Sequence, residues 1–489
     1  MSTPEPARTV QQYIDETPSW HDGTPTPGAP LTAMQWRIWL LAAAGKFFEG
    51  LVVFLTGVAL PIMAKEFSLD GAGHGLVGAA PLAGILFGAT LLGGMADRFG
   101  RKPVFVGEMF LFIAFLVAIS LAPNLPVLVI CLFGMGLALG ADYPTAHMVI
   151  SESIPSKTRG RLVIGAFGFQ ALGALSGVAV GYLILINEPN LSAWRWMYAT
   201  AVLPAAIVAF GRFFVPESAN WLMAKGDRPA ARTALSVLLR REPRYPADFE
   251  LAPAPVDAAW SSGYGALFDR RHRRATAFAS LPWFLQDLGT YGIGIFTPTI
   301  LAATLGHSVV KSGTVSQVVH GDIAAAKGTA MIDILLIVGI VAAVLLADRV
   351  GRVKLQIYGF IGCAAGLLLA ALSSVFDGTT QLILIFAGFM LFNFMTNMGP
   401  NAQTYLIAGE VFPTHLRGKG AGFAASFAKL GAVATAFLFP VLLLDLGQSI
   451  VLGMLIGTSL LGAVVTWAYR IDTRGIDLDE LPSNRDVRA

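Results

Sequence analysis

The feature that most limits the fold of this chain is a succession of apolar segments, each long enough to cross a lipid bilayer. A membrane-spanning helix needs about 20 mostly apolar residues. Such segments lie near residues 37–63, 74–96, 103–122, 125–150, 161–187 and 195–215 and, after a polar interval, near 275–303, 328–347, 354–375, 380–408, 419–444 and 449–470. The sequence therefore predicts an all-α polytopic membrane protein with 12 transmembrane helices in two six-helix halves.

Composition points to the same class of protein. Only 13% of the 489 residues are charged, whereas a soluble domain has about 25%, so a soluble enzyme is excluded. The sequence contains no metal-ligand spacing, nucleotide-binding loop or nucleophile–base arrangement, and we expect neither a catalytic activity nor a cofactor. Cys131 and Cys363 both lie in apolar segments, and we expect buried core residues there rather than a disulfide or a metal site.

The polar intervals divide the chain into five parts. Residues 1–33 are rich in Pro and Thr, which predicts a flexible N-terminal tail, and residues 471–489 form a C-terminal tail. The two helical halves cover residues 34–215 and 275–470, and the linker 216–274 has the composition of short amphipathic helices on the membrane surface. We expect residues 305–327 to form a long external loop, disordered or locally helical, with a gate as the alternative role.

Basic residues gather in alternate loops, after the predicted helices two, four, six, eight and ten. The positive-inside rule places these loops and both termini in the cytoplasm, and we expect the chain in the cell (inner) membrane. The excess of basic residues then faces an anionic leaflet. No basic stripe with interleaved aromatic residues is present, so nucleic acid is not an expected partner. We expect a monomer whose partners are the bilayer, a small solute and a proton.

Two motifs recur in the two halves of the chain. The segment GGMADRFGRK is repeated as VLLADRVGRV, at an offset of 348 − 97 = 251, and ESIPSKTRGR is repeated as EVFPTHLRGK, at an offset of 410 − 152 = 258. Tandem copies of one six-helix unit explain these offsets, and in such folds the solute site lies between the halves near mid-membrane.

The charged residues of these motifs are candidates for a gate on the cytoplasmic side, because arginines and carboxylates can pair across neighbouring helix ends. Simple topology charges are the alternative. The candidates are Asp97, Arg98, Arg101, Glu152, Arg159, Asp348, Arg349, Arg352, Glu410 and Arg417.

Several polar residues lie inside the predicted spans, where charge is costly and usually functional. Asp142, Asp287 and Lys429 lie well inside their segments. Trp283, Asp287 and Tyr291, spaced i, i+4, i+8, form one polar-aromatic stripe on a helix face. Packing or a helix–helix hydrogen bond is the alternative role for single aromatic and amide residues.

The motif GGMADRFGRK resembles the signature of the major facilitator superfamily, and the resemblance extends from about Trp36 to Tyr469. PESANWL, at Pro216–Leu222, is similar to a segment that follows helix six in sugar-porter-like members. The pattern of Asp142-Tyr143-Pro, WFLQDLGTYG, GPN before EVFPTHLRG, and SFAKLGA resembles the phosphate:proton symporter family.

This resemblance implies a substrate site and a proton route. The positions that match the family's phosphate site are Tyr143, Gln170, Trp283, Asp287, Tyr291, Asn401 and Lys429. The resemblance assigns proton movement to Asp142. Where that family has a pair of aspartates in helix one, this chain has only Glu49, preceded by Lys46.

We therefore expect a secondary active transporter that couples a proton to a small anion, phosphate first, by alternating access. Lys429 would supply positive charge, Glu49, Asp142 and Asp287 would carry the proton, and protonation of Asp287 would remove its repulsion of the anion. A sugar, an organic acid or an aromatic acid is the alternative solute, because the Trp and Tyr residues could stack on a ring. A nutrient sensor that binds without transporting is the third hypothesis.

Overall fold

The computed structural model describes residues 8–17, 31–92, 95–240, 250–252, 264–304, 315–412 and 416–471. The part of the chain so described is helical, and its only β-type pairing is one isolated bridge between Arg8 and Leu251. The predicted all-α class is therefore confirmed.

The N-terminal half consists of long helices separated by short turns. The helices are α2 (Ala33–Phe67), α3 (Gly71–Phe87) with its π-helical continuation η1 (Gly88–Leu92), α5 (Arg101–Ser120), α6 (Leu125–Ser153), α7 (Ser156–Asn187) and α8 (Ala193–Arg212). The five-residue helix α4 (Met95–Phe99) precedes α5. Local chemistry fixes the boundaries: Thr32 and Gln35 form a capping box at the start of α2, and Asp70 and Asn124 cap α3 and α6.

The C-terminal half repeats this plan. Its helices are α11 (Arg273–Thr304), α12 (Val315–Val350), α13 (Arg352–Leu372), α14 (Gly378–Met398), α15 (Pro400–Glu410), α16 (Arg417–Leu446) and α17 (Gln448–Tyr469), with short 3₁₀ turns η3 (Tyr264–Phe268) and η4 (Ser373–Val375). The predicted tenth span is divided between α14 and α15, because Pro400 has no N–H to continue the ladder and instead starts a new helix.

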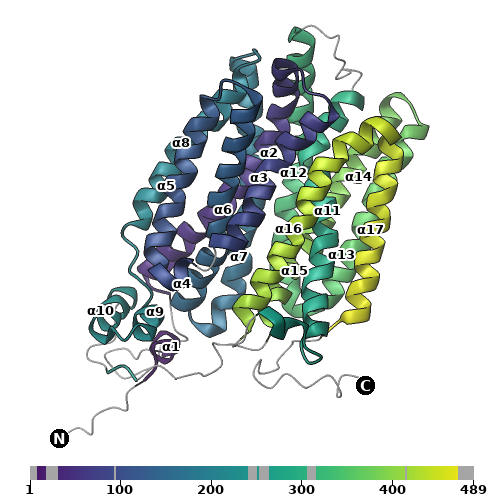
Figure 1. The fold of residues 1–489 in the computed structure, drawn as a ribbon. Helices are drawn as coiled ribbons and strands as arrows, with labels where there is room; N and C mark the ends of the chain where they lie inside the picture. Colours follow the sequence, from purple (N-terminus) through teal and green to yellow (C-terminus); the bar gives the residue numbers. More distant parts are fainter. Residues whose placement is uncertain are drawn as a thin grey trace, which may run out of the picture.

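Eleven helices in the described residues are long and apolar enough to cross a membrane. The 32-residue helix α11 stands among them in the bundle (Figure 1), and its polar side chains lower its hydropathy. With α11 the arrangement agrees with the predicted 12 transmembrane helices.

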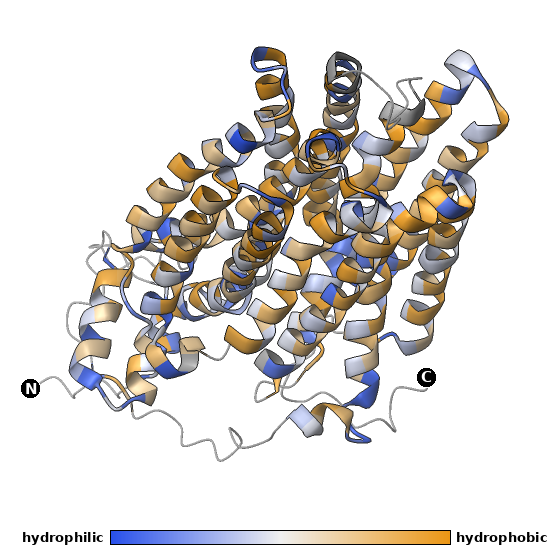
Figure 2. Ribbon diagram, turned by 45° about the horizontal axis from the view of Figure 1, so that its top comes forward, coloured by the Kyte–Doolittle hydropathy of each residue, from blue (hydrophilic) through white to orange (hydrophobic). Residues whose placement is uncertain are grey.

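Figure 1 shows the two halves side by side, with α2–α8 on one side and α11–α17 on the other. The helices α1 (Val10–Asp15), α9 (Ala219–Ala224) and α10 (Arg228–Leu238) lie at one end of the bundle (Figure 1). We call this the inner end, because it carries the repeated basic motifs that predict the cytoplasmic side, and the opposite end the outer end. Hydrophobic residues dominate the helices between the two ends (Figure 2).

Close backbone packing joins the halves toward the outer end. A Cβ at Gly57 of α2 would overlap the carbonyl oxygen of Ile295 on α11, and a Cβ at Gly75 of α3 would overlap that of Phe437 on α16. Glycine at these positions lets helices of opposite halves touch through their backbones. The two halves are therefore in direct contact at these two places toward the outer end.

Two expectations from the sequence need correction. The tail expected to be flexible contains α1, which starts with a capping box between Thr9 and Gln12 and buries Val10, Tyr13 and Ile14 beneath the N-terminal half. Within the expected external loop 305–327, α12 already begins at Val315. The polar composition of this stretch favours a loop, but Val319, Asp322, Ala325 and Ala326 are buried in the bundle. Residues 305–314 lie outside the described part.

Candidate functional site between the halves

Lys429 of α16 lies at the centre of a buried polar cluster. Its Nζ donates to Asp287 Oδ2 at 3.2 Å and to the Tyr291 hydroxyl at 2.5 Å. Asp287 and Tyr291 are one turn apart on α11, so one helix face presents both groups to the lysine. The three residues are 1–3% exposed, so these contacts are formed away from water.

Glu49 of α2 completes the cluster from the N-terminal half. Its Oε1 accepts hydrogen bonds from the Tyr291 hydroxyl at 3.0 Å and the Tyr143 hydroxyl at 3.3 Å, and lies 3.6 Å from Lys429 Nζ. Its Oε2 accepts from Lys46 Nζ at 3.1 Å. Contacts between Glu49 and residues of α11 and α16 therefore connect the two halves at the site.

The cluster contains two lysines and two carboxylates. Lys46, Glu49, Asp287 and Lys429 are each 5% exposed or less, so each charge has lost its hydration and depends on its partners. When all four are ionised, their charges sum to zero. We call these four residues the central ion cluster.

Two further residues of the predicted site lie around the central ion cluster. Gln170 of α7 donates to the Tyr291 hydroxyl at 3.3 Å. Asn401, at the start of α15, accepts a hydrogen bond at 3.0 Å from Gln286, the neighbour of Asp287, and donates to Asn397 at 2.7 Å. Gln170 is thus connected to the cluster through Tyr291, and Asn401 through Gln286.

Trp283 has a different position from the one expected of a direct ligand. It is buried on the inner side of Asp287, where its ring packs edge-to-face against Tyr405 of α15 at 5.9 Å. Tyr405 stacks on Phe167 of α7 at 4.7 Å. These three rings join the two halves on the inner side of the cluster, and we call them the aromatic barrier.

Asp142 does not join the central ion cluster. Its Oδ1 accepts from Arg212 of α8 at 2.8 Å, and Arg212 also binds Glu108 of α5 at 2.8 Å and the carbonyl oxygens of Phe105 and Leu41. The three charged side chains are 0–5% exposed. A Cβ at Gly45 would overlap the Asp142 carboxylate, so this glycine makes room for the group.

Sequence reasoning missed Arg212, Glu108, Phe167 and Tyr405. Arg212 and Glu108 lie toward the inner ends of α8 and α5, where charges are common in any membrane helix. The presence of a charge inside a predicted span was the signal that could have identified Arg212 and Glu108. The two rings of the barrier gave no signal, because aromatic residues in apolar helices usually pack in a core.

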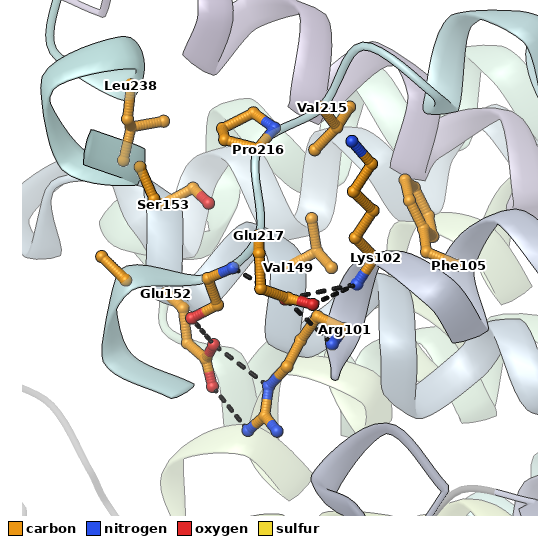
Figure 3. A pocket seen from close by; sticks show the side chains of 13 residues that line it. Arg101, Lys102, Phe105, Val149, Glu152, Ser153, Val215, Pro216, Glu217 and Leu238 are labelled. Carbon is orange, nitrogen blue, oxygen red and sulfur yellow. Dashed lines mark hydrogen bonds and ion pairs between the residues drawn. The ribbon is translucent and has the colours of Figure 1, made fainter. Parts of the chain in front are cut away.

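The first copy of the motifs forms an ion-paired joint at the inner end (Figure 3). Arg101 donates to both carboxylate oxygens of Glu152, at 3.2 and 3.0 Å, and Ser218 also donates to Glu152. Glu217 accepts hydrogen bonds from the backbone N–H groups of Arg101 and Lys102, which is the favoured place for a carboxylate at a helix N-terminus.

Gly100 is required by this joint. Its φ of 106° is rarely adopted by residues with a side chain, and a Cβ there would overlap the Glu217 carboxylate. Glu217 belongs to the PESANWL segment, so the structure explains why the two motifs occur together.

The second copy forms the corresponding contact in the other half. Arg352 binds Glu410 at 2.9 Å, and Gly351 has a φ of 97°. Both ion pairs connect helices of the same half, α5 with α6 and α13 with α15. In this structure they stabilise each half internally and do not bridge the halves.

The structure describes the side chains of three of the other gate candidates. Arg98 and Arg349 are exposed, and Arg159 lies 3.4 Å from the Ser156 hydroxyl. The side chains of Asp97, Asp348 and Arg417 lie outside the described residues.

Comparison with known proteins agrees with this architecture. Residues 38–484 match the family model described as "Sugar (and other) transporter". The putative metabolite transport protein YaaU of Escherichia coli (strain K12) is 29% identical over 454 residues, covering 93% of this chain and 95% of that protein. The probable inorganic phosphate transporter 1-12 of Oryza sativa subsp. japonica is 25% identical, with 91% of each chain covered.

A solved structure has the same fold. The E. coli proton:xylose symporter XylE, a member of the major facilitator superfamily, matches with a TM-score of 0.72 and 20% identity. The match covers 92% of this chain and 98% of XylE.

Proposed function

We propose that this chain, which belongs to the sugar (and other) transporter family and is a membrane transporter rather than an enzyme, is a proton-coupled symporter of a small anion, with inorganic phosphate as the first candidate. The observation that carries the proposal is the position of Lys429, which is held between Asp287 at 3.2 Å and Glu49 at 3.6 Å. A buried cation shared by carboxylates of both halves is a place where an anion can exchange with a carboxylate.

The charge of the central ion cluster supports coupling to a proton. The ionised cluster is neutral, so an anion that enters unaccompanied leaves a net negative charge in a buried site. Such a charge costs several kcal/mol. If the anion replaces Asp287 beside Lys429 and Asp287 takes up a proton, the cluster plus a monovalent anion stays neutral. Anion and proton therefore favour each other's binding, which is the thermodynamic condition for symport.

The hydroxyl and amide groups around the cluster suit an oxyanion. Tyr143 and Tyr291 present hydroxyls and Gln170 presents an amide N–H₂ group toward the same space, and all are donors for phosphate oxygens. The resemblance of this chain to a rice protein named as a phosphate transporter gives further support.

Contacts between the halves on both sides of the site fit alternating access. The backbone contacts at Gly57 and Gly75 join the halves toward the outer end, and the aromatic barrier of Phe167, Tyr405 and Trp283 lies between the site and the inner end. We propose that the halves rock about the central ion cluster, and that the pairs Arg101–Glu152 and Arg352–Glu410 keep each half rigid while the inner gate opens.

Reconstituted vesicles test the proposal. Purified protein in phosphate-free liposomes should exchange radiolabelled phosphate, and net uptake should increase when the outside is made more acidic than the lumen. Absence of phosphate exchange, with or without a pH gradient, would exclude phosphate as the solute.

A sugar or an organic or aromatic acid is the second candidate. The likeness of the fold to the xylose symporter XylE favours it, as does the aromatic barrier, whose rings could stack on a ring-shaped solute. Competition separates the two: xylose and benzoate should not reduce phosphate exchange if the anion proposal is correct, and a strong reduction by either supports the second candidate.

A further inference from the structure

Six carboxylic acids are buried in the described part of the chain: Glu49, Glu108, Asp142, Asp287, Asp322 and Asp333. The first four each form an ion pair with Lys46, Lys429 or Arg212. Asp322 and Asp333, both on α12, form no ion pair with any described residue. The absence of a cationic partner in the described part distinguishes these two acids from the other four.

Asp322 is buried near the outer end of α12. It is 1% exposed, and neither carboxyl oxygen has a hydrogen-bond partner among the described residues. Asp333 is 2% exposed; its Oδ1 accepts from Asn393 of α14 at 2.9 Å, and its Oδ2 has no partner.

The two aspartates lie on one face of α12. They are 333 − 322 = 11 residues apart, or about three helical turns and a rise of about 17 Å. Thr329, between them on the same face, is fully buried. This face therefore presents a line of polar side chains from the outer end of the helix to its middle.

The line continues toward the central ion cluster through amides. Asn393 contacts Asp333, and Asn397, one turn further along α14, donates to the Leu336 carbonyl at 2.9 Å and accepts from Asn401 at 2.7 Å. Asn401 in turn accepts from Gln286, which adjoins Asp287.

The buried charged groups on the helices that pack against α12 belong to other contacts. Glu49 and Lys46 on α2 and Asp287 on α11 belong to the central ion cluster, and Cys363 on α13 contacts the Phe392 carbonyl. The described side chains of α7 and α14 offer these aspartates only the Asn393 amide. An isolated carboxylate inside a protein without water or a cation is costly enough to be neutralised instead.

We propose that Asp333 is a second proton-binding site of the transporter, separate from the central ion cluster, and that Asp322 delivers protons to it from the outer end. One proton binds to the free Oδ2 of Asp333 and forms an O–H group, and the same proton leaves to the inner side in the other conformation. The coupling to transport rests on the proposed function, whereas proton binding at Asp333 does not.

The first experiment therefore needs no substrate. The infrared spectrum of the reconstituted protein should contain the carbonyl stretch of a protonated carboxyl, and Asp333→Asn should remove part of this band. The matched control Asp445→Asn, at an exposed aspartate near the outer end of α16, should leave it unchanged. An unchanged band in Asp333→Asn, with the protein correctly folded by size-exclusion chromatography, would overturn the proposal.

The second experiment measures coupling. With the membrane voltage clamped, each coupled proton adds about tenfold to the maximal accumulation ratio per pH unit. Asp333→Asn imitates the protonated form and should therefore retain solute exchange. Its maximal accumulation ratio should be about tenfold lower than that of the wild type for each pH unit of gradient. Unchanged accumulation means that Asp333 only provides a structural hydrogen bond, which contradicts the proposal.

The two experiments distinguish a failure of the Asp333 proposal from a failure of the proposed function. If the wild-type protein does not exchange phosphate, the proposed substrate is wrong, and the infrared arm still decides whether Asp333 binds a proton. If replacing Na⁺ by choline removes exchange in wild type but not in Asp333→Asn, the site holds a metal cation, and the proton assignment is wrong.

Discussion

Substitution of Lys429 is the sharpest test of the anion site. Lys429→Ala removes the cation that Asp287 and Glu49 share at 3.2 and 3.6 Å. A close charge pair that has been fully desolvated contributes about 2–5 kcal/mol to binding, and about 3 kcal/mol corresponds to a loss of roughly 100-fold in affinity. We therefore expect phosphate uptake by proteoliposomes at low substrate concentration to fall by about two orders of magnitude.

A loss of uptake alone could come from an unpaired Asp287 that distorts the site. The double variant Lys429→Ala with Asp287→Asn removes both charges and separates the explanations. The readout is phosphate exchange, which needs no proton gradient. If Lys429 only neutralises Asp287, the double variant should recover exchange; if Lys429 binds the anion, exchange should remain low. Lys327→Ala, at an exposed lysine of α12, is the matched control. Normal uptake by folded Lys429→Ala would refute the anion reasoning.

Three further predictions concern the parts around the site. Arg212→Met should destabilise the protein by about 3–5 kcal/mol, because Glu108 and Asp142 lose their buried cation. Lower pH should restore part of the thermal stability, since protonated carboxyls need no cation. Equal losses of stability at all pH values would contradict this reasoning. Gly100→Ala should cost about 1–3 kcal/mol because of its positive φ, whereas Gly107→Ala, with open space around it, should cost nothing measurable in the same unfolding assay. Tyr405→Ala should open the aromatic barrier. A cysteine that replaces Gln170 should then react faster with a membrane-impermeant thiol reagent added at the inner face. An unchanged reaction rate would show that the barrier lies elsewhere.

The fold could be predicted because the bilayer imposes a simple rule on the sequence. Each span must satisfy its backbone hydrogen bonds internally and present apolar side chains over about 20 residues, so hydropathy alone locates the helices. The break between α14 and α15 and the start of α12 at Val315 were not predicted. Hydropathy does not register a helix that continues through polar residues whose side chains are buried by neighbouring helices.

The polar part of the site was visible in the sequence for a related reason. Lys429, Asp287 and Glu49 stand out because charges are rare in spans, and the spacing of Asp287 and Tyr291 predicts a common face. Spacing within one helix gives no information about partners on other helices, however. The sequence therefore left open that Asp142 pairs with Arg212 instead of joining Lys429, and that Trp283 packs on Tyr405.

The two halves share their inner joints but differ in their buried acids, and this difference bears on how the protein could work. In the N-terminal half, Glu108 and Asp142 are fixed by Arg212, with four hydrogen bonds from one guanidinium. The guanidinium holds both carboxylates in place, and its single positive charge balances only one of them. In the C-terminal half, Asp333 has no cation among the described residues, and protonation neutralises it. A rigid N-terminal half and a C-terminal half that takes up and releases protons would let proton binding bias the relative position of the halves through the shared contacts of Lys429 and Glu49.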